Sequence, residues 1–244
     1  MNKAMPQVFS PEHKLSKLIQ HNSDLLFMLQ HFNIHLPLQD KTIANICAAQ
    51  NISEKLFITI ANLYNNNSLS PVTDLPFTDA NTLLLFLKNS HVFYSEELYP
   101  KILDTIEAMA KVNTHKEMVL VQKFFIDYFN EVTEHLAYEN KIVFPYVLSL
   151  LKQIENPKAP NQSNSNYTVS EYKEHHNDIE EKLIDLKNLL IKYLPEQDDQ
   201  TIRRKLFFKL SKLESDLAIH SNIEDLLLIP LVAKMENYLK DARK

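Results

Sequence analysis

The sequence repeats itself at a spacing of 85 residues, and the repeat carries ionisable residues in a helical pattern. The segment 135–139 (HLAYE) is followed, six residues after its glutamate, by Pro145, and the segment 220–224 (HSNIE) is followed in the same way by Pro230. In both segments a histidine precedes a glutamate by four residues, which places the two side chains one turn apart on the same helix face. One such pair is expected by chance. Two pairs in register predict an internal duplication, with two similar helical hairpins.

The same spacing links two further histidines, His91 and His176. Each copy therefore has a histidine and then, 44 residues later, the His-x-x-x-Glu segment. His175 stands beside His176, but only His176 obeys the repeat, so we expect His175 to be a bystander. The candidate metal ligands are His91, His135, Glu139, His176, His220 and Glu224.

Imidazole and carboxylate groups without thiolates suit Fe, Mn or Zn ions. Four histidines and two glutamates are enough for two metal ions with two bridging carboxylates and open positions for a further ligand. Two bridging carboxylates in a four-helix bundle are typical of di-iron and di-manganese proteins. Without a metal, burying so many ionisable groups at one level would be costly.

The turns expected from the sequence bring all six residues to one level. In an antiparallel hairpin, residues equidistant from the turn lie level, so the first turn should fall near residue 113 and the second near 198. Asn113-Thr114 and the segment 194–199 (LPEQDD) supply these breaks, and Asn156-Pro157 supplies the middle one. The pattern predicts an up-down four-helix bundle, with the site roughly 32 Å from the first turn at ~1.5 Å per residue.

The composition supports an all-α protein. The chain contains no glycine, and glycine serves tight hairpins and loops that bind phosphates or nucleotides. A net charge of −5 gives no basic face for nucleic acid, and the single cysteine excludes an intrachain disulfide. No stretch is long and apolar enough for a signal peptide or a membrane span, so we expect a cytoplasmic protein with no membrane partner.

The predicted domains are a small helical N-terminal domain at 1–66, a linker at 67–79, and the bundle at 80–244, made of repeats 80–155 and 168–240. In the N-terminal domain we expect one helix from Pro11 to about Leu29 and two short helices. The short helices are predicted at 42–49 and 53–62. The first bundle helix is expected to begin at Asp79 or Thr82 and to run through Lys111, and the others are predicted at 114–154, 170–193 and 199–239, with kinks at Pro145 and Pro230.

Other polar residues are less strongly indicated as parts of the metal site. Glu131 and Asp216 are also 85 residues apart, one turn before His135 and His220, and are either solvated acids or groups that orient a ligand or relay protons. Glu180 lies four residues after His176, but the repeat pairs it with Ser95 and does not support it as a ligand. We expect Tyr94 and Tyr138 to line the pocket or to pack in the core, and His115 to lie at the surface or cap a helix. Nothing in the sequence indicates that the histidines of the N-terminal domain are ligands; these are His13, His21, His31 and His35.

These motifs resemble the hemerythrin-like (HHE cation-binding) family, and more narrowly they are similar to di-iron iron–sulfur cluster repair proteins. The resemblance covers residues 80–240 and rests on His91 seven residues before a leucine and on the segments 135–145 (HLAYENKIVFP), 174–183 (EHHNDIEEKL) and 220–230 (HSNIEDLLLIP). It implies that His91, His135, His176 and His220 ligate two irons, which Glu139 and Glu224 bridge.

The N-terminal domain is also similar to the short domain that precedes the bundle in these repair proteins, through residues 29–47. Leu36-Pro37 stands where that family usually has an adjacent cysteine pair followed by glycine, so a role that depends on those thiols is in doubt.

The resemblance implies a repair function or a response to nitrosative or oxidative stress. The alternative is a sensor or carrier of O2 or NO without enzymatic activity, although dedicated oxygen carriers of this type tend to have five histidine ligands. A helical scaffold with a fully coordinated structural metal is a third reading. A protein partner of residues 1–66 is conceivable, and the sequence leaves the oligomeric state and any enzymatic activity open.

Overall fold

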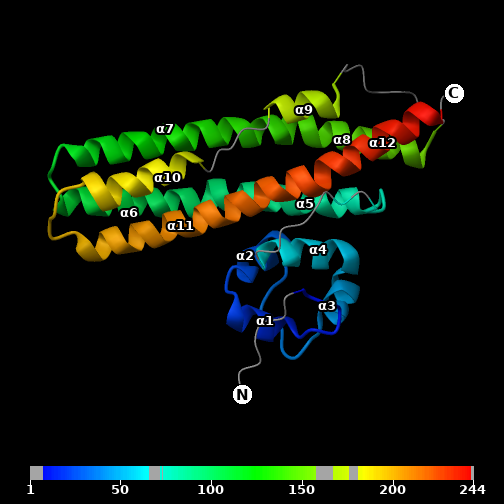
Figure 1. Cartoon of the computed structure of the whole chain (residues 1–244), viewed down its shortest axis with the longest axis horizontal. Helices are drawn as coiled ribbons and strands as arrows, with labels where there is room; N and C mark the ends of the chain where they lie inside the picture. Colours follow the sequence, from blue (N-terminus) through cyan, green and yellow to red (C-terminus); the bar gives the residue numbers. More distant parts are fainter. Residues whose placement is uncertain (1–7, 66–71, 73, 158–166, 176–180, 243–244) are drawn as a thin grey trace. The chain divides into compact units, whose positions relative to one another are not determined.

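The computed structural model describes residues 8–65, 72, 74–157, 167–175 and 181–242 (Figure 1). These residues form helices joined by turns and contain no β-strand beyond an isolated antiparallel bridge between Lys14 and Thr42. The predicted fold class, an all-α protein with a helical bundle and a helical N-terminal region, is confirmed. Within this described part of the chain, no helix has both the length and the apolar character needed to cross a membrane.

The chain divides into two compact units. The first unit contains Met1–Ser90, Lys141–His176 and Ile219–Lys244, and the second contains His91–Asn140 and Asn177–Ala218. The linker expected at 67–79 lies partly outside the described residues, and the domain boundaries drawn from the sequence stay a prediction.

Four short helices begin the first unit, and Figure 1 shows them gathered together in blue to cyan. They are α1 (Leu15–His21), α2 (Leu25–His31), α3 (Ile43–Gln50) and α4 (Glu54–Tyr64). Thr42 and Ser53 cap the last two, because each side-chain oxygen accepts a hydrogen bond from the backbone N–H three residues later. The two short helices expected here are confirmed within one or two residues at each end.

The single helix expected from Pro11 to Leu29 is wrong, because the chain turns at Asn22. The side chain of Asn22 accepts a hydrogen bond from the N–H of Asp24 at 3.0 Å and donates one to the carbonyl of Tyr64 at 2.7 Å. Asparagine competes with the helical backbone in this way, so its local bonds and its tie to α4 end α1.

The N-terminal helices pack against α5 (Asp79–Val92) within the first unit. The ring of Phe86 lies edge-on to Phe32 at 4.7 Å and to His31 at 5.2 Å between centroids. The side-chain amide of Asn89 donates to the carbonyl of His31 at 2.8 Å. Apolar contact and this hydrogen bond together fix the last full turn of α5 before residue 91.

The first unit is completed by α8 (Phe144–Glu155), α9 (Val169–His175) and α12 (Ile229–Asp241). Helix α12 packs against α8 and α9. One oxygen of Glu236 accepts hydrogen bonds from the Tyr146 hydroxyl at 2.6 Å and from the N–H of Val169 at 2.8 Å, so a single carboxylate ties the three helices together.

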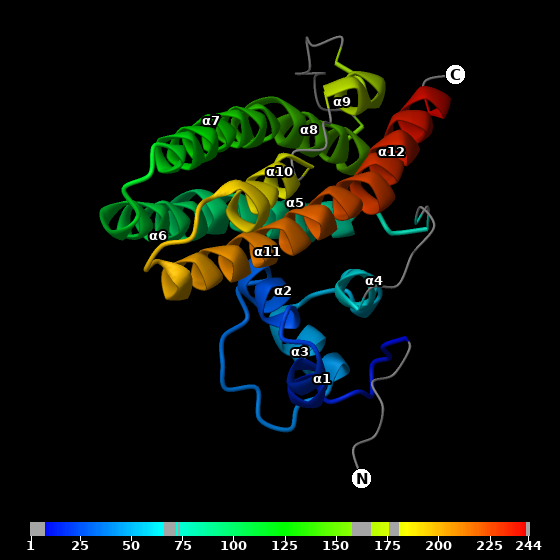
Figure 2. The same cartoon turned by 60° about the vertical axis from the view of Figure 1, so that its left-hand side comes forward.

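The second unit has an apolar core formed by η1 (Phe93–Leu98), α6 (Tyr99–Val112), α7 (Glu117–Tyr138), α10 (Glu181–Asn188), η3 (Leu189–Tyr193) and α11 (Gln200–Ile223). Figure 2 shows α6, α7, α10 and α11 running alongside one another. The turns predicted near 113 and 198 are confirmed, because α6 ends at Val112 and the chain between 194 and 199 separates η3 from α11. Asn113 and Asp199 join these two turns through a buried hydrogen bond of 2.7 Å.

Each copy of the repeat contains a π-helical turn at the same place. These turns are η2 (Glu139–Val143) and η4 (Glu224–Leu228), and each ends two residues before a proline, Pro145 or Pro230. Proline cannot donate to the carbonyl four residues earlier, and its ring crowds that carbonyl, so the wider turn accommodates it. The carbonyl of Leu226, four residues before Pro230, accepts a hydrogen bond of 2.8 Å from the N–H of Val72. The structure thus places a π-helical turn before each proline at which we predicted a kink.

Candidate metal centre

The first pair of candidate ligands lies where α7 passes into η2. Nε2 of His135 is 3.3 Å from Oε1 of Glu139, one helical turn further along. The Glu139 side chain is fully buried, and 12% of the His135 side chain is exposed. The spacing of four residues therefore brings the imidazole and the carboxylate together, as the sequence predicts.

Glu139 faces a second histidine through its other oxygen. Oε2 of Glu139 is 3.4 Å from Nε2 of His91, which belongs to the last turn of α5. The two oxygens of one buried carboxylate thus each lie beside a different histidine. This is the arrangement that a carboxylate needs if it is to bridge two ions, each held by its own histidine.

The second copy repeats the pair where α11 passes into η4. Nε2 of His220 is 3.5 Å from Oε1 of Glu224, and both side chains are buried. The other ring nitrogen of His220, Nδ1, lies 2.9 Å from the hydroxyl of Ser90. Ser90 is fully buried, and sequence reasoning overlooked it because its repeat position carries no matching hydroxyl.

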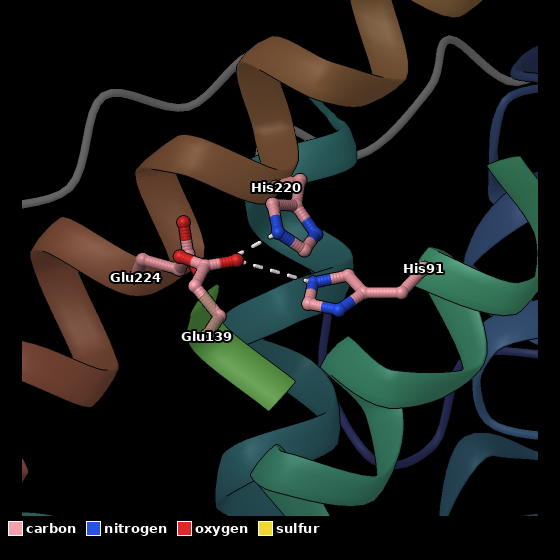
Figure 3. Close-up of side chains that lie close together, drawn as sticks. All are labelled: His91, Glu139, His220 and Glu224. Carbon is pink, nitrogen blue, oxygen red and sulfur yellow. Dashed lines mark ion pairs between the residues drawn. The ribbon is translucent and has the colours of Figure 1, made fainter. Parts of the chain in front are cut away.

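Four of the six candidates form one group. His91, Glu139, His220 and Glu224 each offer a ligand atom, and these atoms all lie within 4.8 Å of one another. Figure 3 shows the two imidazoles and the two carboxylates pointing toward one another, with the ion pairs drawn as dashed lines. At most 3% of any of these side chains is exposed. A metal cation bound at this group would offset the large cost of burying two carboxylates together.

The remaining two candidates differ in what the structure describes. His135 is placed beside Glu139 but outside the group of four. His176 and its rival Glu180 lie outside the described residues, as does the side chain of His175. The choice of His176 over His175 therefore rests on the repeat, and the assignment of all six residues as ligands stays a prediction.

The two acids one turn before the repeated pairs have different environments. Asp216 is buried and accepts a hydrogen bond of 2.8 Å from the hydroxyl of Tyr94, which is buried as well. Glu131 is exposed and forms an ion pair with Lys182. Of the two possible roles, the solvated acid therefore applies to Glu131, whereas Asp216 belongs to a buried hydrogen-bonded pair. Tyr138, the other tyrosine near a ligand, is half-buried.

The other histidines lie apart from this group. His115 is 40% exposed at the first turn and contacts Gln197, in agreement with a surface role. His13, His21 and His35 are half-buried or exposed in the N-terminal helices and loops. His31 is buried, and it packs on Phe86 as described above.

The donor set fits a first-row transition metal. It consists of imidazole nitrogens and carboxylate oxygens, and the only cysteine of the chain, Cys47, is buried in α3 of the N-terminal region. Such ligands suit Fe, Mn or Zn.

The comparison with known families agrees with this geometry. The sequence profile of the hemerythrin HHE cation binding domain matches residues 96–232, which are 137 of the 244 residues. Neither a curated protein nor a solved structure gives a significant match. The matched segment contains three of the four residues of the buried group, and His91 lies five residues before it. The chain therefore belongs to the hemerythrin HHE cation-binding family.

Proposed function

We propose that this protein holds two non-haem metal ions, with iron favoured over manganese and zinc, and that it reacts with a diatomic ligand such as O2 or NO. The ligands in this proposal are His91, His135, Glu139, His176, His220 and Glu224. When bound, a di-iron centre would supply electrons and open coordination positions for such a ligand.

The observation that carries the proposal is the position of Glu139. Its two oxygens lie beside His91 and His135, at 3.4 and 3.3 Å, so one carboxylate serves two separate imidazoles. A single ion at the group of four would leave His135 without a role. The internal repeat gives Glu224 the equivalent position in the second copy, which supports a pair of ions with two bridging carboxylates.

Among physiological roles, we favour iron–sulfur cluster repair or a response to nitrosative or oxidative stress, on the strength of the sequence resemblance. If the protein repairs iron–sulfur clusters, we expect it to do so without thiol groups of its N-terminal region. Leu36-Pro37 stands in place of the expected cysteine pair, and burial, with a smaller contribution from Glu54, raises the pKa of the Cys47 thiol to about 12. A thiol that stays protonated is a poor metal ligand and a poor nucleophile.

The second candidate function is reversible binding of O2 or NO by a sensor or carrier without enzymatic activity. The lack of a reactive thiol favours it, because binding a gas needs only the metal and an open position. The two functions differ in whether the protein returns unchanged after the ligand is removed.

The test is to load the metal-free protein with ferrous iron under anaerobic conditions and to follow its absorption spectrum during exposure to O2, to NO and then to vacuum. New bands on gas addition support an open di-iron site. Full reversal under vacuum favours the sensor or carrier, and consumption of the gas over repeated cycles favours the stress-response function. A spectrum that ignores both gases would contradict the proposal and leave a structural metal.

A further inference from the structure

Ser90 makes two contacts through one hydroxyl group. Its oxygen lies 2.7 Å from the carbonyl oxygen of Leu87, one turn earlier in α5, and 2.9 Å from Nδ1 of His220. All three groups belong to the first unit, and Ser90 is fully buried. Both distances are those of good hydrogen bonds.

The two contacts together fix the direction of the second hydrogen bond. A serine hydroxyl has one hydrogen, and a carbonyl oxygen can only accept, so the Ser90 hydroxyl donates to Leu87. The Ser90 oxygen must then accept from His220, which requires a proton on Nδ1 of that ring. We propose that Ser90 is a positioning residue, which keeps the proton on Nδ1 of His220 and so leaves Nε2 as the ligand atom.

The position of Nε2 agrees with this role. Nε2 of His220 lies on the side of Glu224, 3.5 Å from its carboxylate, and Figure 3 shows the ring turned with this nitrogen toward the carboxylates of the group. A metal ligand needs a lone pair on the nitrogen that faces the ion, and a hydrogen bond at the other nitrogen sets which one that is. This inference rests on the proposed function for its purpose, but the proton on Nδ1 does not depend on any metal.

The N-terminal helices hold Ser90 in place for this contact. Phe86 and Asn89 lie four residues and one residue before it in α5. Phe86 packs on the C-terminal end of α2, and Asn89 donates a hydrogen bond to it. A hydroxyl on a fixed helical turn aligns an imidazole better than one on a mobile loop, so the packing of residues 8–65 contributes to the orientation of His220.

The direct test is nuclear magnetic resonance of the metal-free, 15N-labelled protein, with the His220 ring signals assigned by comparison with His220→Gln. We expect Nδ1 of His220 to carry a proton, and this proton to exchange with water much faster in Ser90→Ala. The matched control is Ser149→Ala. Ser149 also donates to the carbonyl three residues earlier, at 2.7 Å, but from α8 and to Tyr146. A wild-type His220 with an unprotonated Nδ1 would overturn the proposal, even if Ser90→Ala failed to fold.

The second readout is affinity for Zn2+, measured by competition with a chromophoric chelator. Loss of a group that orients a metal-bound histidine weakens binding by about 10- to 100-fold. We expect a loss of this size in Ser90→Ala and little change in Ser149→Ala. Equal affinity in all three proteins would refute the role of Ser90. If the wild type itself bound no metal, the proposed function would fail, and the Nδ1 proton would still decide whether Ser90 sets the tautomer.

Discussion

The buried pair formed by Tyr94 and Asp216 offers a quantitative test of how the second unit is held together. The hydroxyl of Tyr94 donates to Oδ2 of Asp216 at 2.8 Å, between segments 122 residues apart in sequence. Both side chains are buried, so water does not readily replace the hydrogen bond when it is removed. Tyr94→Phe keeps the ring in the apolar core and deletes only the hydroxyl.

The expected cost follows from the burial and the chemistry of the acceptor. A hydrogen bond to a carboxylate contributes about 1.5–3 kcal/mol, and we take a value near the middle of that range for this buried bond. We therefore expect Tyr94→Phe to lower the free energy of unfolding by about 2 kcal/mol. With a denaturant slope of about 3 kcal/mol per molar, the urea midpoint falls by roughly 0.7 M.

The matched control is another buried tyrosine of the same core. The hydroxyl of Tyr99 lies 3.5 Å from that of Tyr128, a long contact between two neutral groups, so Tyr99→Phe should cost less than about 1 kcal/mol.

The assay is urea unfolding of metal-free protein, so that metal affinity does not enter the result. A double-mutant cycle with Asp216→Ala isolates the interaction between the two side chains, and we expect a coupling of about 1–2 kcal/mol. A coupling below about 0.5 kcal/mol would show that the pair does not stabilise the unit, and the account of Asp216 as a buried structural partner would be wrong.

Three further predictions concern the metal and the thiol. Glu224→Ala and His135→Ala should each lose most of the bound metal, measured by elemental analysis, while far-UV circular dichroism stays close to that of the wild type; full occupancy in either variant would rule out its assignment as a ligand. Adding ferrous iron to the metal-free protein should raise the free energy of unfolding by about 2.7 kcal/mol at a hundredfold excess over the dissociation constant of one site, and an unchanged melting temperature would argue against a specific site. Burial raises the pKa of Cys47 to about 12, whereas in urea the pKa of this thiol should be near 8.5. At pH 8 the folded protein should therefore react with a thiol reagent roughly a thousandfold more slowly than the unfolded protein. Comparable rates would show that the thiol is accessible and acidic.

The sequence predicted the long-range features of this fold because the duplication encodes them. The turns at 113 and 198 were predicted as the midpoints between the candidate ligands of each hairpin, and asparagine and proline mark them locally. The pairs His135–Glu139 and His220–Glu224 follow from helical periodicity alone. These features depend on the number of residues between the repeated motifs, which can be read from the sequence directly.

The features that were missed depend on neighbours that spacing does not specify. The repeat treats Glu131 and Asp216 alike, but Asp216 meets a buried tyrosine, whereas Glu131 meets a lysine at the surface. The break at Asn22 needs the carbonyl of Tyr64, which is 42 residues away. Ser90 precedes the candidate ligand His91 directly in the sequence, but its contact with His220 arises only when the helices pack.

The π-helical turns were predicted only in part. Pro145 and Pro230 predict a kink in each helix. The structure has a π-helical turn there instead, which begins at Glu139 or Glu224. Each wider turn therefore begins at a candidate metal ligand, and π-helical turns occur often at functional sites.

The most direct test of the central claim is the metal content of the chain after anaerobic reconstitution with ferrous iron and removal of the excess. The account predicts about two irons per wild-type chain, and a large loss in Glu139→Ala, because that carboxylate faces the histidines of both ion positions. No bound iron in the wild type, or two irons per chain in Glu139→Ala, would contradict it.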